Sequence, residues 1–260
     1  MITIKEYTNN VCYLEIDRPN KKNALAKSTI KELINFFKTT ANSLEFNVLV
    51  LSGSNGFFSA GADLAWMKEG MEQTNEENRA DAHLFNTLYH EMSLYPKPII
   101  AKVDKGAYGG AIGLMACADV VITSPNAQFK FSETALGIIP ATVAPYIVRK
   151  IGNSNARYLL LSGHLFNGEA ALNYGLVHIL VPEQEMDSTT NQTAEYMATL
   201  GPKATAKTKE LLNYLDHESF IISQETKDYC ASLIAAARKS DEGQTRVSSF
   251  FKKTNSDKND

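Results

Sequence analysis

A run of small residues from Gly106 to Asp119 holds the glycines best suited to chemistry in this sequence. The apolar segment Ala111–Ala118 predicts a short helix within this run. Gly109 and Gly110 would then lie at the helix N-terminus, where backbone N–H groups lack helical partners and favour negative charge. A ligand oxygen can reach such donors because glycine has no side chain. Close helix packing through small residues explains the pattern equally well, and the glycine spacing is not a dinucleotide-binding fingerprint.

Glu133 is a lone carboxylate in an apolar stretch, between Phe129-Lys-Phe131 and Gly137-Ile-Ile-Pro140. An apolar environment raises the pKa of a carboxyl group toward the range useful for proton transfer. Glu133 is therefore a candidate acid/base. A surface glutamate that caps a turn is the alternative, and the sequence leaves both open.

Histidines and carboxylates are frequent from Glu69 to Glu91, but their spacing matches no metal-binding motif. We therefore predict no metal site. Ser59 or Ser132 with His83 or His90 would be the parts of a serine hydrolase, yet neither serine stands in a G-x-S-x-G elbow.

The periodicity of apolar residues predicts the elements that position these groups. Thr29 and Glu32 match a capping box at the start of an amphipathic helix. Residues 68–82 are polar without apolar periodicity, which favours a solvated or mobile segment. From Glu183 onward the pattern is helical, so we place a boundary between 1–187 and 188–260. Strands are predicted at 11–16, 48–52, 120–123, 127–131 and 176–181, and 97–104 is predicted to be a loop with a short buried strand, which indicates an α/β fold.

Composition excludes several classes of partner. The net charge of −3 and the pI near 6.0 give no sign of nucleic-acid binding. Three cysteines without a C-x-x-C pair suit reduced thiols. With neither a signal-peptide pattern nor an apolar run long enough for a membrane span, we expect a cytoplasmic protein without membrane partners.

Four motifs taken together resemble the enoyl-CoA hydratase/isomerase (crotonase) family. They are Phe58-Ser-Ala-Gly-Ala-Asp-Leu64, Gly106-Ala-Tyr-Gly-Gly-Ala111, Phe129-Lys-Phe-Ser-Glu133 with Gly137-Ile-Ile-Pro140, and Gly175-Leu-Val177. The resemblance covers nearly the whole chain. It implies a crotonase-like spiral of ββα units over 1–187 and a C-terminal helical trimerisation region over 188–260. It further implies an acyl-CoA substrate, no cofactor beyond that coenzyme A, and a homotrimer or a dimer of trimers.

The resemblance also implies roles for individual residues. The backbone N–H groups of Ala62 and Gly110 would form an oxyanion hole for the thioester carbonyl, and Glu133 matches the second of two catalytic glutamates. At the position of the first glutamate this chain has Gly113, which we expect to leave open space beside the acyl chain. The substrate-binding residues implied are Lys21, Lys22, Ala24, Ala60, Asp63, Leu64, Gly109, Gly113, Phe250 and Lys253.

Three functions remain open at this point. A hydratase is favoured, because the motifs around Phe58–Met67, Gly109–Leu114 and Ile139–Pro145 look like those of bacterial 3-methylglutaconyl-CoA hydratases of leucine breakdown. A single glutamate also suits an enoyl-CoA isomerase, which moves one proton along the acyl chain. The third is a catalytically weak acyl-CoA-binding homologue. A second acid or base, if one exists, is expected from the segment Glu69–Glu91.

Overall fold

The structure is a computed structural model that describes residues 1–70 and 72–215, together with 241 and 245. Phe250 and Lys253, which the family resemblance assigns to CoA binding, lie outside these described residues. None of the helices in the described ranges is both long and apolar enough to cross a membrane.

Six strands of the described chain form the main sheet, in the order β1-β2-β3-β4-β6-β9. The edge strand β1 is antiparallel to β2, and every other neighbouring pair is parallel. Parallel pairing is expected where helical crossovers connect the strands. The bounds are β1 (Ile2–Thr8), β2 (Val11–Ile16), β3 (Val48–Gly53), β4 (Ile99–Val103), β6 (Val120–Thr123) and β9 (Ile179–Leu180).

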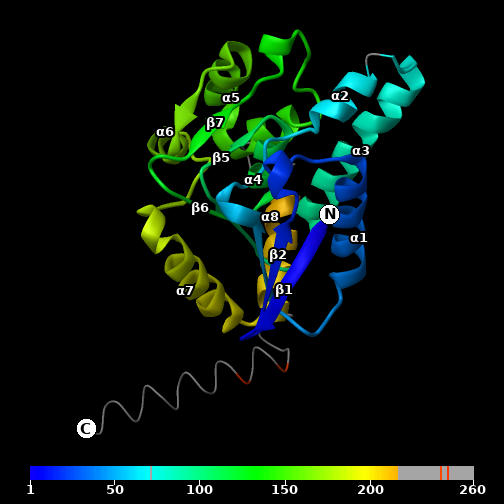
Figure 1. Ribbon diagram of the computed structural model, residues 1–260. Coiled ribbons are helices and arrows are strands. Elements are labelled where there is room, and N and C mark those ends of the chain that lie inside the picture. Colours follow the sequence, from blue (N-terminus) through cyan, green and yellow to red (C-terminus); the bar gives the residue numbers. More distant parts are fainter. Residues whose placement is uncertain (71, 216–240, 242–244, 246–260) are drawn as a thin grey trace, which may run out of the picture.

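Helices cover both faces of this sheet, as Figure 1 shows. Alternate residues of β3 point to opposite faces. Leu49 and Leu51 belong to the large core with α1 (Lys27–Thr40) and α3 (Asn75–Leu94), whereas Val48 and Val50 pack with α7 (Met186–Ala198). Burial on both sides explains why β3 reads as a continuous apolar run.

The helix that contains the proposed boundary at 187, α7, packs directly on the sheet. Met186, Ala194 and Ala198 of α7 are buried against it, and α8 (Pro202–Leu215) follows. The division into 1–187 and 188–260 stays a prediction, and in space α7 is part of the main core.

A smaller sheet carries the segments that lead to the site. Its order is β5-β7-β8, with β5 (Gly106–Tyr108) parallel to β7 (Gln128–Lys130) and β8 (Phe166–Asn167) antiparallel to β7. Because Tyr108 pairs with Lys130, the chain leaves both strands at the same edge. The surrounding helices are α2 (Leu64–Gly70), α4 (Gly110–Cys117), α5 (Ala144–Ser162) and α6 (Gly168–Asn173).

One local prediction is wrong, and a second is refined. Helix α1 begins at Lys27 and has no capping box, because the Thr29 hydroxyl accepts a hydrogen bond from the N-terminal ammonium and the Glu32 carboxylate accepts one from the Ile2 N–H. Most described residues of the polar segment 68–82 are exposed, as expected of a solvated segment. Much of it is nevertheless helical, since α3 starts at Asn75 behind a capping box formed by Thr74 with Glu77. A reciprocal cap starts a helix whose first turns are too polar to show an apolar period.

Candidate active site

Two adjoining cavities meet at the edge of the small sheet. The smaller cavity, about 210 Å³, is lined by Gly109, Gly110 and Glu133. The larger cavity, about 730 Å³, adjoins it and is bordered by residues of α2 and α3. Ala62, Leu64, Met67, Phe85, Leu136, Ile138 and Thr142 line both. The two cavities therefore form one continuous site, with the predicted acid/base at the smaller end.

The backbone N–H groups of Ala62 and Gly110 both belong to the wall of the smaller cavity. Within the described part of the chain, neither donates a hydrogen bond to a protein acceptor. Gly110 is the first residue of α4, where an N–H has no helical partner. The same cavity is thus lined by two residues whose backbone N–H groups have no protein acceptor.

Gly109 brings the backbone close to Glu133. It precedes α4 with φ 50° and ψ −126°, and its N–H donates to the Lys130 carbonyl at 2.9 Å. A Cβ at this position would lie 3.1 Å from Glu133 Oε1, in a conformation that residues other than glycine rarely adopt. A larger residue would thus disturb the carboxylate directly.

Glu133 also lines the smaller cavity. Its Oε2 is buried and has no hydrogen-bond partner. Burial raises the pKa of Glu133 above its ordinary value, and the backbone N–H groups of Glu133 and Ser132 only partly oppose this effect. A carboxyl group with one free oxygen and a raised pKa is suited to exchange protons with a ligand.

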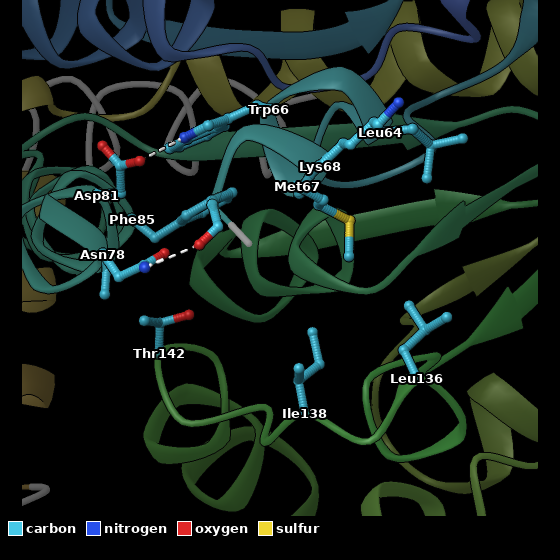
Figure 2. A pocket seen from close by; sticks show the side chains of 13 residues that line it. Leu64, Trp66, Met67, Lys68, Asn78, Asp81, Phe85, Leu136, Ile138 and Thr142 are labelled. Atoms are coloured by element: carbon cyan, nitrogen blue, oxygen red, sulfur yellow. Dashed lines mark hydrogen bonds between the residues drawn. The ribbon is translucent and has the colours of Figure 1, made fainter. Parts of the chain in front are cut away.

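The larger cavity has mainly apolar walls. Figure 2 shows Trp66, Met67 and Phe85 facing Leu136, Ile138 and Thr142 across the space, with the Met67 side chain pointing between them. The Trp66 and Phe85 rings are stacked, with centroids 5.5 Å apart and planes within 5°. Rigid aromatic and aliphatic walls fit the hydrocarbon part of a ligand.

A second carboxylate, Asp81, lies at the side of the larger cavity. Its Oδ2 accepts a hydrogen bond from Trp66 Nε1 at 2.6 Å and pairs with Lys27 Nζ at 2.8 Å. Although burial alone would raise the pKa of Asp81, these partners hold it below its ordinary value. Asp81 is therefore an ionised anchor for Trp66. Among the residues that line either cavity in the described ranges, it is the one carboxylate contributed by the segment Glu69–Glu91.

The residues predicted to bind CoA are spread over both walls and the scaffold. Ala60 lines the smaller cavity and donates its N–H to the Lys22 carbonyl at 2.9 Å, which brings the exposed Lys21–Lys22 turn to that wall. Leu64 is 77% exposed at the mouth. Ala24 and Asp63 are buried and line neither cavity: Arg18 donates to the Ala24 carbonyl and pairs with Asp63 at 2.7 Å.

The expectation of open space beside Gly113 is wrong. An ideal Cβ at Gly113 would lie 2.5 Å from Tyr89 Cζ and 2.7 Å from the Tyr89 hydroxyl oxygen. Gly113 is fully packed, and neither it nor Tyr89 lines either cavity. The missing first glutamate is thus replaced by a tyrosine ring from α3.

The sequence interpretation missed the wall residues of the larger cavity and Tyr89. A signal was present, since Phe85, Leu88 and Tyr89 within the charged segment Glu69–Glu91, and Met92 just after it, follow helical spacing. The serine-hydrolase parts do not meet. Ser59 is buried with its hydroxyl donating to the Asn23 carbonyl, and His83 and His90 line neither cavity.

No cluster of three or more His, Cys, Asp or Glu side chains that could hold a metal occurs within the described ranges.

Comparison with known proteins places this geometry in a family. The family model for enoyl-CoA hydratase/isomerase matches residues 6–253. The chain is 30% identical to the 2,3-dehydroadipyl-CoA hydratase of Escherichia coli over 249 residues, which are 95% of this chain and 94% of that protein.

Solved structures agree. A Legionella pneumophila protein assigned as an enoyl-CoA hydratase/isomerase (crotonase) is 36% identical with a TM-score of 0.90, covering 97% of this chain and 96% of that chain. Pseudomonas aeruginosa AtuE is 31% identical with a TM-score of 0.92 at the same coverage. The predicted α/β crotonase-like fold is confirmed, and the chain belongs to the enoyl-CoA hydratase/isomerase family.

Proposed function

We propose that this protein is an enoyl-CoA hydratase, a hydro-lyase that adds water across the C2–C3 double bond of an enoyl-CoA thioester. One observation carries the proposal: two backbone N–H groups without acceptors and the unpaired Oε2 of Glu133 line the same small cavity. The chemistry needs both parts, because negative charge develops on the thioester oxygen while a proton moves near C2 and C3.

The reaction can run with one carboxylate. Ionised Glu133 takes a proton from water as the water oxygen bonds to C3, and the electron pair of the double bond moves onto the thioester oxygen. The N–H groups of Ala62 and Gly110 stabilise that enolate, an effect worth about 3–4 kcal/mol for each donor. Protonated Glu133 then gives its proton to C2, so both parts of water add on one face. The proposal uses no cofactor beyond the coenzyme A of the substrate.

A single glutamate also supports a second candidate, an enoyl-CoA isomerase in which Glu133 moves a proton between C2 and C4. Mass and absorbance separate the possibilities. The protein would be saturated with crotonyl-CoA and with a 3-enoyl-CoA while the enoyl absorbance is followed. Loss of absorbance with gain of the mass of one water supports the hydratase, and gain of absorbance at unchanged mass supports the isomerase. Tight binding without either change would contradict both and leave an acyl-CoA-binding homologue.

The finer substrate proposal is 3-methylglutaconyl-CoA, whose acyl group ends in a carboxylate. Lys68 is the one lysine or arginine among the residues described at the larger cavity, and its side chain is exposed. An apolar cavity rejects an unpaired carboxylate, so this substrate requires a cation at the mouth. We expect Lys68→Met to raise KM for 3-methylglutaconyl-CoA by about tenfold and to leave KM for crotonyl-CoA unchanged. Equal KM values for both substrates in the wild type would count against the carboxylated substrate.

Assembly and CoA contacts complete the proposal. We propose that Lys21 and Lys22 contact the phosphates of CoA, that Phe250 and Lys253 add contacts from a neighbouring subunit, and that the protein forms a trimer or a dimer of trimers. The position of the Lys21–Lys22 turn beside Ala60 supports the first part. Within the described residues, Cys12 and Cys117 are buried cysteines outside any disulfide, which supports a cytoplasmic location.

A further inference from the structure

Tyr89 is the largest buried group at the site that the proposed reaction leaves without a role. Its side chain is fully buried, and its hydroxyl donates a hydrogen bond to the Gly110 carbonyl oxygen at 2.7 Å. The Tyr89 ring also packs against Gly113 of the same helix, α4, where it fills the space that a side chain at position 113 would need. A phenol from α3 therefore holds the first turn of α4.

This contact lies immediately behind an oxyanion donor. An ideal Cβ on Gly110 would lie 3.1 Å from the Tyr89 hydroxyl oxygen and 3.0 Å from Phe85 Cε1. Gly110 has no side chain of its own to fix its orientation, and Gly109 before it has a backbone conformation that favours glycine. The Gly110 N–H shares a peptide plane with the Gly109 carbonyl, which accepts a hydrogen bond from the Ile112 N–H at 2.9 Å. Its direction therefore follows the placement of the first turn of α4, which the Tyr89 hydroxyl holds through the Gly110 carbonyl.

Tyr89 does not act on the substrate itself. It lines neither cavity, and burial raises the pKa of its hydroxyl well above the ordinary value of 10.0. The phenol therefore stays a neutral donor to Gly110 throughout the working pH range. A proton exchange with ligand would require it to leave a fully packed position.

We propose that Tyr89 is a positioning residue that holds the first turn of α4 and thereby aims the Gly110 N–H into the smaller cavity. This inference rests on the proposed function, because it takes Gly110 as an oxyanion donor. Oxyanion stabilisation depends on donors held in place before charge develops, so a loosened donor reduces kcat.

The test compares Tyr89→Phe with Tyr146→Phe. The first keeps the ring and removes the hydroxyl that holds Gly110. The second removes a hydroxyl from the neighbouring ring, whose centroid lies 5.3 Å from that of Tyr89 and which lines neither of the two cavities. We expect Tyr89→Phe to lower kcat about tenfold with little change in KM, and Tyr146→Phe to change neither.

A spectroscopic measurement separates positioning from general stability. Butyryl-CoA, isotope-labelled at the thioester carbonyl, binds without turnover, and its carbonyl stretching band shifts to lower frequency when oxyanion donors polarise it. We expect a smaller shift in Tyr89→Phe than in the wild type. A fluorotyrosine at position 89 keeps both ring and donor, so it should retain the wild-type shift even if Tyr89→Phe folds poorly.

Wild-type kcat and wild-type band position in Tyr89→Phe would overturn the proposal, as would the same change in Tyr146→Phe. The two proposals fail differently. A wild type that hydrates no enoyl-CoA but shifts the carbonyl band through Tyr89 contradicts the hydratase and supports the positioning role. If the carbonyl band of butyryl-CoA does not shift on binding to the wild-type protein, the oxyanion assignment is wrong, and so is the proposed role of Tyr89.

Discussion

Two carboxylates border the same continuous site, and their surroundings give them opposite properties. Glu133 has a buried oxygen without a partner and a raised pKa. Asp81 is bound by an indole N–H and a lysine, and its pKa is lowered. Burial acts in the same direction on both, so the difference comes from the donors around each group.

The comparison shows how a one-glutamate site can keep a second acid nearby without giving it a catalytic role. Asp81 accepts a hydrogen bond from Trp66 and forms an ion pair with Lys27, and thereby fixes the aromatic wall of the larger cavity. Glu133 keeps one oxygen available for a proton. An oxygen without a hydrogen-bond partner therefore distinguishes the proposed proton-transfer group from the structural one.

The largest expected effect comes from Glu133→Gln, which keeps the size of the side chain and removes the titrating group. We expect kcat to fall by about 10²–10⁴-fold, the usual contribution of general acid–base catalysis. Loss of enoyl absorbance under saturating substrate measures it. Asp81→Asn is the matched control and should retain kcat within a few fold. A similar loss in both variants would show that Asp81 also takes part in the chemistry.

Gly113→Glu introduces a carboxylate at the position of the family's first glutamate. It tests whether the site can hold a second carboxylate close to Glu133. We expect it to lower the free energy of unfolding by about 1–3 kcal/mol or more, because its Cβ overlaps the Tyr89 ring. Urea denaturation measures this loss. The double variant Gly113→Glu with Tyr89→Leu frees the space and should be more stable than Gly113→Glu alone. Full stability of the single variant would mean that the ring can move aside.

The smallest effect concerns the stability contributed by Asp81. We expect Asp81→Asn to lower the free energy of unfolding by about 1–2 kcal/mol at neutral pH, since it removes charge-assisted hydrogen bonds. Because the folded pKa of Asp81 is lowered, this contribution is present above the ordinary value of 3.8 and is lost as pH falls through the folded pKa. Urea denaturation at several pH values should show wild type and variant converging in acid. A difference that persists there would indicate a packing effect instead.

The sequence was informative where one short segment decides the structure. The apolar run of β3 and the small residues before α4 predicted their elements because burial and helix termini leave local signals. The partner of Gly113 could not be predicted in this way. Tyr89 comes from α3, twenty-four positions away in the sequence. A glycine in a sequence does not indicate which distant side chain packs against it. The lack of a partner for Glu133 Oε2 could not be predicted either, because the folded chain decides which donors lie near a side chain.

The packing of Tyr89 against Gly113 has a consequence for how such a site can change over generations. A glutamate that arises at position 113 meets a ring already in its place, and a smaller residue that arises first at position 89 leaves a void in a full core. Each intermediate is less stable than the starting protein. We therefore expect the one-carboxylate and two-carboxylate arrangements to be separated by single substitutions that each lower the stability of the fold.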